Sequence, residues 1–185
     1  MSLVVSITGA SGTVYGIRLL EVLREKSIGT DLVITETAKK ILNRETRRLV
    51  EEIEGLATRC YDESDLEAPI SSGTYKTLGM VVIPCSMKTL AGIASGFSYN
   101  LVIRAAEVTL KERRTLVLVP RETPLNIVHL RNMWYLARIG AVILPPMPAF
   151  YNRPKTLNDI IDYTVGRVLD CFSVDHDLYE RWGVC

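Results

Sequence analysis

The sequence predicts an α/β protein built on one doubly wound parallel sheet. Short runs of β-branched and other apolar residues alternate with longer segments whose apolar residues recur at helical spacing. The first short run leads into a segment of small residues, after which the apolar spacing becomes helical. Because repeated strand–helix units produce parallel strands covered by helices on both faces, these observations favour a sheet between two helical layers.

The N-terminal half opens with a buried strand at residues 3–7, where the sequence Leu-Val-Val-Ser-Ile is rich in β-branched residues. The predicted elements that follow are a helix from about Val14 to Lys26, a strand at 31–35, a helical pattern from Glu36 to about Glu54, an irregular segment from Cys60 to Gly79, a strand at 80–84 and a helix that starts at 84–86. The second helical pattern is heavily charged, so one of its faces is expected to be solvated.

The C-terminal half continues the alternation. Its predicted elements are a helix at 100–114, a strand at 115–119, a helix at 124–139, a strand at 141–144 and a closing helix at 156–172. No repeat, linker or low-complexity segment interrupts the pattern, so residues 1–185 are predicted to form a single domain of the Rossmann or flavodoxin-like class.

Composition excludes several classes of function. With 48% hydrophobic and 23% charged residues, the chain has the makeup of a globular domain with a full core. A formal net charge of +1 gives no reason to expect binding to nucleic acid or to an acidic membrane surface. No apolar run approaches the ~18 residues of a membrane span, and the first strand begins too early for a signal peptide to precede it.

The cysteines and histidines predict a reduced protein without a metal site. Cys60, Cys85, Cys171 and Cys185 form no Cys-x-x-Cys pair, and the chain holds two histidines. We therefore expect a cytoplasmic protein that binds no structural or catalytic metal.

The ends of the predicted strands are the expected ligand site, because ligands of such sheets bind beyond the carboxyl ends of the strands. These ends fall at 8–12, 35–36, 84–86, 120–122 and 145–151. In the first of them, Gly9 and Gly12 let the backbone turn tightly, and Ser11 adds a hydroxyl. A helix that opens there aims free N–H groups and a positive dipole end at one spot, which suits a phosphate. An ordinary tight turn without a ligand is the alternative.

A nicotinamide-dependent enzyme is a rival interpretation of the first loop. The G-x-G-x-x-G fingerprint is absent, yet short-chain dehydrogenases often begin with a similar Thr-Gly-Ala-Ser-Gly. Their Tyr-x-x-x-Lys pair is formally present as Tyr151 and Lys155. That pair needs a continuous helix to bring both side chains to one face, and Pro154 lies between them. The proline therefore weakens the dehydrogenase interpretation.

Cationic and hydroxyl side chains occur near several strand ends. Arg104 and Lys111 lie on one stripe of a predicted helix, and Arg121 stands where a strand stops. Tyr151 and Arg167 belong to other elements that are expected to converge on them. Guanidinium forks, an ammonium charge and a hydroxyl are the donors that bind a phosphate. For any one of these residues, a solvated helix face or a surface salt bridge is the alternative.

Seven motifs stand in order along the chain. They are Thr8-Gly9-Ala10-Ser11-Gly12, Pro84-Cys85-Ser86-x-x-Thr89-Leu90, Arg104-Ala105-Ala106, Leu110-Lys111-Glu112-Arg113-Arg114, Leu118-Val119-Pro120-Arg121-Glu122-x-Pro124, Phe150-Tyr151-x-x-Pro154 and Arg181-Trp182-Gly183. With these motifs the chain resembles the flavin prenyltransferases of the UbiX/Pad1 family, which were long labelled aromatic-acid decarboxylases. The resemblance runs from the first strand to the carboxyl end.

The resemblance implies a reaction. Members of this family join a dimethylallyl group from dimethylallyl phosphate to N5 and C6 of reduced FMN, which builds a fourth ring on the flavin. The prenylated FMN then passes to a decarboxylase of the UbiD type. No metal is required. The chain is accordingly expected to be a metal-independent transferase with FMN as its cofactor and prenyl acceptor.

The resemblance also implies residue roles. Contacts to FMN fall to Gly9, Ala10, Ser11, Thr35, Ser86, Thr89 and Arg121, and contacts to dimethylallyl phosphate fall to Arg104, Lys111, Arg121, Tyr151 and Arg167. Glu122 would supply a proton to the departing phosphate, as a carboxylic acid among cations can. Ser11 and Glu45 would move protons at the flavin during ring closure.

Other side chains near the motifs have simpler interpretations. Lys88 adds a cation near the edge of the flavin site. Trp182 is either a lid residue or a C-terminal core anchor, while His129, Trp134 and Tyr135 are interpreted as packing residues.

The expected assembly is a symmetric homo-oligomer, a dodecamer by the family resemblance, in which a neighbouring subunit completes each active site. One doubly wound domain leaves the carboxyl edge of its sheet open to water, and an allylic cation formed there must be shielded. The stiff apolar segment at 145–150 suits a subunit contact. Packing of this segment on its own domain is the alternative.

Two other functions remain open from the sequence. A flavin-dependent cysteine decarboxylase would share the architecture, although neither His129 nor His176 lies at one of the strand ends. A non-catalytic FMN carrier would have an apolar pocket without converging cations.

Overall fold

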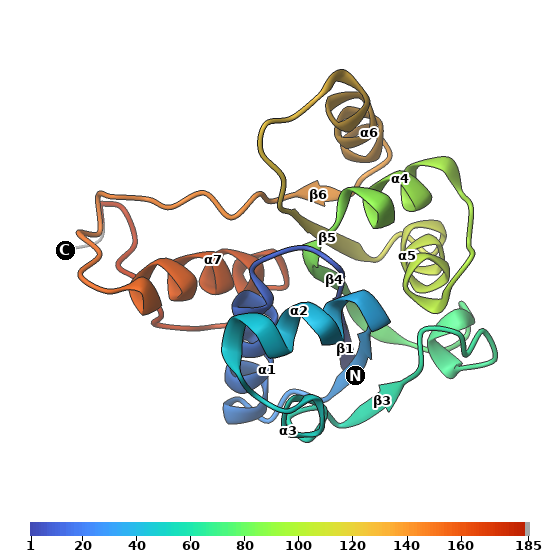
Figure 1. Cartoon of the computed structure of the whole chain (residues 1–185), viewed down its shortest axis with the longest axis horizontal. Coiled ribbons are helices and arrows are strands. Elements are labelled where there is room, and N and C mark those ends of the chain that lie inside the picture. The colour runs from blue at the N-terminus through green and yellow to red at the C-terminus, as the bar shows by residue number, and fades with distance from the viewer. Residues whose placement is uncertain (184–185) are drawn as a thin grey trace.

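A computed structural model describes residues 1–183 and shows the predicted doubly wound α/β fold (Figure 1). Within these residues, one parallel sheet has the strand order β3-β2-β1-β4-β5-β6. Its strands are β1 (Ser2–Ile7), β2 (Thr30–Ile34), β3 (Arg59–Tyr61), β4 (Thr77–Cys85), β5 (Thr115–Pro120) and β6 (Val142–Ile143). The expectation of a reduced thiol at Cys185 lies outside the described residues.

Helices connect the strands. They are α1 (Thr13–Glu25), α2 (Glu36–Thr46), α3 (Val50–Glu54), α4 (Met87–Ser95), α5 (Leu101–Lys111), α6 (Ile127–Arg138) and α7 (Leu157–Cys171), with a 3₁₀ turn η1 at Pro69–Ser71. None of these helices is long and apolar enough to cross a bilayer.

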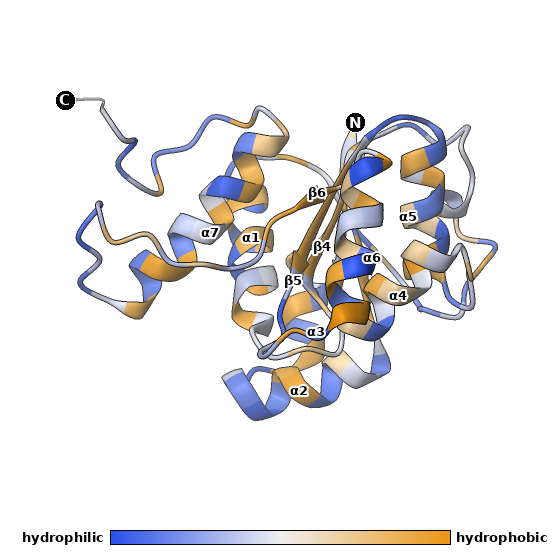
Figure 2. Ribbon diagram, turned by 90° about the horizontal axis from the view of Figure 1, so that it is seen from above, coloured by the Kyte–Doolittle hydropathy of each residue, from blue (hydrophilic) through white to orange (hydrophobic). Residues whose placement is uncertain are grey.

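The sheet is buried on both faces, as Figure 2 shows with its apolar strands between two groups of helices. Successive side chains of a strand point to opposite faces, so each central strand feeds two separate cores. Leu3 and Val5 of β1 pack with α1, α2, α3 and α7, whereas Val4 packs with α4, α5 and α6. These three side chains are at most 2% exposed, which explains the nearly continuous apolar runs in the sequence.

The direction of winding reverses between β1 and β4. From β1 the chain proceeds outward through β2 to β3 and then returns to place β4 on the other side of β1. In doubly wound sheets, the crevice at such a reversal, beyond the carboxyl ends of the strands, is where ligands bind. The fold therefore places the candidate site at the ends of β1 and β4.

Two local predictions differ from the structure in the segment between β2 and β4. The helical pattern at 36–54 divides into α2 and α3, because Arg47 adopts a positive φ of 55° and ends α2 as its C-cap. The segment predicted to be irregular contains the edge strand β3, where Arg59 and Cys60 are exposed. An exposed edge strand has no alternation of apolar residues, so periodicity does not reveal it.

The interpretation of residues on α6 as packing was wrong for two aromatic side chains. Trp134 is 58% and Tyr135 is 44% exposed, and Leu136 is the fully buried residue of this helix. His129 instead takes part in the cap of the helix start, where its Nδ1 accepts from the Asn126 amide at 3.4 Å and its own amide donates to Asn126 Oδ1 at 2.9 Å. The aromatic rings face a groove between α4 and α6 rather than the core.

Candidate active site

A cavity of about 320 Å³ opens at the carboxyl ends of β1, β2 and β4. It is lined by Gly9, Thr35, Thr37, Ser86, Met87, Lys88, Thr89, Asn100 and Glu122. The lining is rich in hydroxyl groups and combines residues from the first, second, third and fourth predicted strand ends. Five residues expected to touch cofactor or to catalyse, namely Gly9, Thr35, Ser86, Thr89 and Glu122, are therefore brought together here.

Thr8 joins β1 to β4 at the rim of this cavity. Its hydroxyl donates to the Pro84 carbonyl at 2.8 Å and accepts from the Ser86 amide at 2.8 Å. Thr8 is fully buried, so these bonds are shielded from water and fix Gly9 beside Ser86. A Cβ on Gly9 would lie 2.6 Å from Thr37 Cγ2, which shows how little room the backbone leaves on this side.

Helix α4 directs its N-terminus at the cavity. The N-cap Ser86 accepts a hydrogen bond from the Thr89 amide at 3.3 Å, and the two hydroxyl oxygens are 3.0 Å apart. The amides of Met87 and Lys88, in the first turn, have no acceptor within the helix. Free amides and the positive end of the helix dipole favour an anion. The Lys88 ammonium lies over the Tyr99 ring, 5.3 Å from its centroid, so its charge is directed to the neighbouring groove. The start of α4 thus fits a phosphate group.

Arg121 provides a buried donor without an acceptor. Its amide donates to the Cys85 carbonyl at 3.3 Å, which holds the end of β5 beside the end of β4. Its Nε is buried and has no hydrogen-bond partner within residues 1–183. Burying a guanidinium N–H without an acceptor is costly, so a bound anion is the expected partner. The residues present therefore fit the phosphate of FMN.

Glu45 occupies the N-terminus of α1. Its carboxylate accepts from the Gly12 amide at 3.0 and 3.1 Å, from the Thr13 amide at 2.9 Å and from the Thr13 hydroxyl at 2.8 Å. The Ser11 hydroxyl also bonds to it. The amides of Gly12 and Thr13, which were expected from the sequence to face a phosphate, therefore face a side-chain carboxylate. This helix start is already neutralised, in contrast to the start of α4.

The same carboxylate gives stability a dependence on pH. Burial raises the pKa of Glu45, but hydrogen bonds from Ser11, Thr13 and Gly12 outweigh burial, so the pKa lies below its ordinary value of 4.5. A pKa lowered by folding adds stability that is present above pH 4.5 and is lost as the pH falls through the lower folded-state value. We expect the melting temperature to fall more steeply with acidification in the wild type than in Glu45→Gln. Calorimetry below pH 4.5 checks this, and parallel curves would contradict it.

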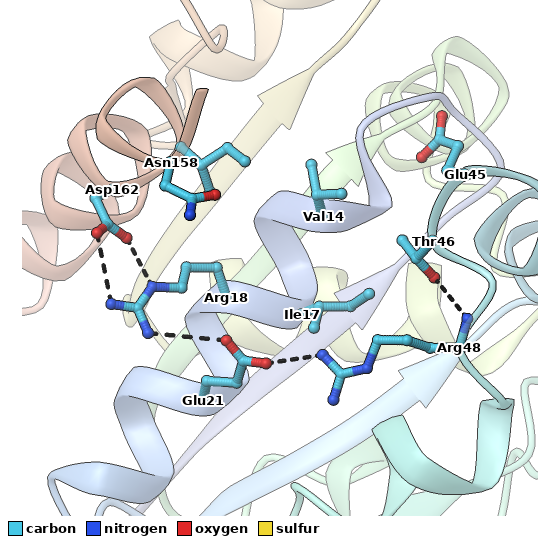
Figure 3. A pocket seen from close by; sticks show the side chains of 10 residues that line it. Val14, Ile17, Arg18, Glu21, Glu45, Thr46, Arg48, Asn158 and Asp162 are labelled. Atoms are coloured by element: carbon cyan, nitrogen blue, oxygen red, sulfur yellow. Dashed lines mark hydrogen bonds and ion pairs between the residues drawn. The ribbon is translucent and has the colours of Figure 1, made fainter. Parts of the chain in front are cut away.

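A chain of ion pairs holds the end of α2, which carries Glu45, against α1 and α7 (Figure 3). Arg48 lies 2.8 Å from Glu21, Glu21 lies 3.8 Å from Arg18, and Arg18 lies 2.7 Å from Asp162. The four side chains are partly exposed, so each pair adds little to stability. Their effect is geometric. They line a hollow of about 400 Å³ beside Glu45 and connect α1 with α7 and with the segment that follows α2.

Two of the predicted donor-binding cations lie away from this cavity within one chain. Lys111 ends α5, next to the beginning of β5, and its Nζ pairs with Glu112 at 2.6 Å. Arg121 follows the other end of β5, and six strand residues span about 20 Å. Arg104 donates from Nε to the Ser71 carbonyl at 3.2 Å. Arg104 and Lys111 therefore present their charge on a different surface of the chain.

Tyr151 and Arg167 lie on an arm formed by the segment after β6, helix α7 and the C-terminal tail, which extends from the sheet (Figure 1). Both residues are exposed. Trp182 packs edge-on against Tyr151, with 5.2 Å between ring centroids. The Trp182 side chain is 78% exposed, so it is not a core anchor.

The tyrosine–lysine pair of the dehydrogenase interpretation is not formed. Helix α7 begins at Leu157, whereas Tyr151 and Lys155 precede it in a turn and an irregular segment. The two side chains therefore do not share a helix face.

Sequence reasoning missed part of the cavity wall. Thr37 and Asn100 line the cavity, and the Asn100 side-chain amide donates to Glu63 at 2.9 Å. Asparagine before a helix signals an N-cap, but nothing local shows that it faces a ligand. Ala10, expected to touch FMN, is buried, and its amide donates to the Thr8 carbonyl at 2.7 Å.

Known proteins resemble the chain over its whole length. Residues 1–169 match the family model described as Flavoprotein. The chain is 50% identical over 183 residues to the flavin prenyltransferase UbiX of Methanocaldococcus jannaschii, with 99% of each chain covered. It is also 50% identical over 180 residues to the mitochondrial flavin prenyltransferase PAD1 of Saccharomyces cerevisiae, covering 97% of this chain and 74% of that relative.

Solved structures give the same result. The crystal structure of AnUbiX (PadA1) in complex with FMN and dimethylallyl pyrophosphate matches with a TM-score of 0.97 at 47% identity, covering 100% of this chain and 98% of the other. The dodecameric FMN-dependent UbiX-like decarboxylase of Escherichia coli O157:H7 matches with a TM-score of 0.97 at 49% identity, covering both chains fully. The peptidyl-cysteine decarboxylase EpiD, at 15% identity and a TM-score of 0.67 over 93% of this chain and 98% of the other, shows a shared fold alone. The chain belongs to the family of the flavin prenyltransferases UbiX and PAD1.

Proposed function

We propose that the chain is a flavin prenyltransferase that joins a dimethylallyl group from dimethylallyl phosphate to reduced FMN. The observation that carries this is the cavity at the carboxyl edge, where the α4 amides offer donors to an anion beside Glu122. The preceding residue, Arg121, adds a buried Nε that has no hydrogen-bond partner among residues 1–183. The relative AnUbiX holds FMN together with dimethylallyl pyrophosphate, which supports a site for both a flavin and a phosphorylated prenyl donor.

The walls of the cavity are suited to hold FMN. The amides of α4 offer donors to its phosphate, and the hydroxyls of Thr35 and Thr89 supply further hydrogen bonds. Arg121, next to Glu122, is suited to add a guanidinium donor. Glycine at position 9 lets Thr37 pack against the bare backbone at the cavity wall. When bound in reduced form, FMN supplies the nucleophilic N5 and C6 positions that accept the prenyl group.

The acidic residues take separate parts in the proton balance. Glu122 lies at the cavity beside Arg121, and its carboxylate accepts from the Thr123 amide at 3.0 Å. When the C–O bond of the donor breaks, its electron pair leaves with the phosphate. We assign to Glu122 the transfer of a proton to that departing phosphate. Ser11 and Glu45, already hydrogen-bonded to each other, are suited to accept the proton released at the flavin when the ring closes.

The donor site is proposed to be shared between copies of the chain. Arg104 and Lys111 lie on a different surface from Glu122, and the arm that carries Tyr151 exposes Met147 and Phe150 by 68% and 71%. Apolar side chains clustered on an extended arm favour contact with a neighbouring subunit. Because the Escherichia coli relative is dodecameric, we propose the same assembly here, with the arm of one copy near the cations of another.

A direct test uses the protein with reduced FMN and dimethylallyl phosphate under anaerobic conditions. The extracted flavin is expected to gain the mass of one five-carbon prenyl unit, and the diphosphate donor is compared in parallel. Titration with FMN and with NADPH serves as the binding control, because the proposal requires a flavin site. Tight binding of NADPH without binding of flavin, or an unchanged flavin mass, would refute the proposal.

Arg121→Gln is expected to weaken FMN binding about 10- to 100-fold, because a charge-assisted hydrogen bond contributes about 1.5–3 kcal/mol. Flavin fluorescence on titration measures the affinity. Arg131→Gln on the exposed surface of α6 is the matched control and should bind as the wild type does. Equal affinity in Arg121→Gln would show that its buried Nε does not face the phosphate.

The location and the recipient of the product complete the proposal. We place the protein in the cytoplasm, a reducing compartment that suits the free thiols of Cys60, Cys85 and Cys171. Its product, prenylated FMN, is proposed to serve a decarboxylase of the UbiD type.

A further inference from the structure

The C-terminal tail, residues 173–183, turns back along α7 toward the start of that helix (Figure 1). One carboxylate holds it there. Asp170 Oδ1 accepts from His176 Nε2 at 3.1 Å and from an Arg181 Nη at 2.7 Å, while Oδ2 accepts from the Tyr179 hydroxyl at 2.5 Å. Three tail residues thus converge on a single side chain of α7.

His176 is the buried member of this group, with its side chain 1% exposed. Its Nδ1 accepts from the Leu178 amide at 3.3 Å. A neutral ring with an acceptor at Nδ1 carries its proton on Nε2, so Nε2 donates to Asp170. Both ring nitrogens are therefore used, one to bind α7 and the other to shape the tail itself.

Gly166 gives the tail its place on α7. It is buried in the middle of the helix, and a Cβ there would lie 2.7 Å from His176 Cε1 and 2.7 Å from two ring carbons of Tyr179. Glycine weakens a helix interior. Its presence here is explained by the close approach of the tail, which no other residue would permit without displacement.

The tail and Asp170 both reach residues proposed to bind the donor phosphate. Arg167 Nε lies 3.5 Å from Asp170 Oδ2, one turn along α7. At the far end of the tail, Trp182 packs edge-on against Tyr151. Tyr163 of α7 packs against the other side of this group, 6.3 Å from the Tyr151 ring centroid. The same contacts therefore orient the guanidinium and the phenol.

We propose that Asp170, His176 and Gly166 form a latch that positions the donor-phosphate site by holding the tail on α7. The latch rests on the proposed function, in which Arg167 and Tyr151 bind dimethylallyl phosphate. Asp170 is a positioning residue, because it acts on the donor through Arg167 and the tail. The FMN cavity is built from other elements and does not depend on the latch.

Two variants test this by different routes. Asp170→Asn removes the charge that gathers the tail, and Gly166→Ala pushes His176 and Tyr179 away while leaving Asp170 in place. Both are expected to weaken binding of dimethylallyl phosphate to the assembly loaded with oxidised FMN by about tenfold, the lower end of what is lost when residues supporting a site are removed. Asp177→Asn makes the same charge change on the exposed part of the tail and serves as the control.

Three measurements separate the outcomes. In turnover, KM for the donor is expected to rise in both variants with a smaller change in kcat, FMN affinity stays at the wild-type value, and amide exchange across residues 174–183 becomes faster. Unchanged donor binding in both variants overturns the latch, and so does a loss of FMN binding that accompanies the loss of donor binding. A wild-type chain that fails to bind the donor refutes the proposed function itself. This failure is told apart from failure of the latch because it is seen in the unsubstituted protein.

Discussion

Replacement of Glu122 by glutamine is expected to slow formation of prenylated FMN by about 100- to 10,000-fold, the usual contribution of general acid catalysis. Glutamine keeps the shape of the side chain and can still accept from the Thr123 amide, which lies 3.0 Å from the carboxylate. It cannot give a proton to a departing phosphate. Single-turnover measurements with excess donor under anaerobic conditions isolate this step from product release.

The control for this variant is Glu67→Gln, an equal change at an exposed carboxylate ahead of η1. It should turn over at the wild-type rate. Glu122→Gln should bind FMN with unchanged affinity, because the carboxylate is assigned to the donor. A single-turnover rate equal to that of the wild type would reject the acid role, and so would a loss explained entirely by weaker FMN binding.

Lys111→Ala is expected to lower activity by about 100-fold, comparable to removing one charged donor from a developing anion. A second expectation concerns assemblies reconstituted from two different variant chains. If Lys111 serves the site of a neighbour, an assembly reconstituted from Lys111→Ala and Glu122→Gln chains contains some sites with both side chains intact. Random equal mixing makes this roughly a quarter of sites in a closed symmetric assembly.

Activity of the mixture well above that of either variant alone is therefore the expected result. Size-exclusion chromatography checks that the mixed and unmixed assemblies have the same size. The control is a pool of the two variant assemblies that were not dissociated, so that their subunits have not exchanged. A mixture no more active than the mean of its components would show that each chain uses its own Lys111.

The sheet could be predicted because its central strands are buried on both faces. Runs such as 3–7 and 80–84 stand out in the sequence for this reason. Strand β3 could not be found, since Arg59 and Cys60 face solvent at an edge. The division of the long helical pattern into α2 and α3 depends on the left-handed conformation of Arg47, which an arginine adopts through tertiary context and not by preference.

The site was predictable where residues follow strands directly. Gly9, Ser86 and Glu122 could be placed by the rule that strand ends meet at one edge. Spacing on a helix carries less information. Arg104 and Lys111 share a stripe, but seven residues of α5 extend about 10 Å along the helix, away from that edge. Periodicity shows which face a residue is on and does not show which end of the sheet it reaches.

The hydrogen bonds of the Thr8 hydroxyl show that the cavity forms late in folding, which links the stability of the native chain to flavin binding. It bonds to residues 76 and 78 positions away in the sequence, so the cavity does not exist until β1 and β4 have paired across everything between them. Contacts of such long range form slowly. A ligand that binds this cavity recognises the completed sheet and adds about 2.7 kcal/mol when present at 100 times its Kd. A good supply of FMN therefore raises the share of newly made chain that persists in its native state, and a cell short of flavin is expected to lose more of this protein to proteolysis.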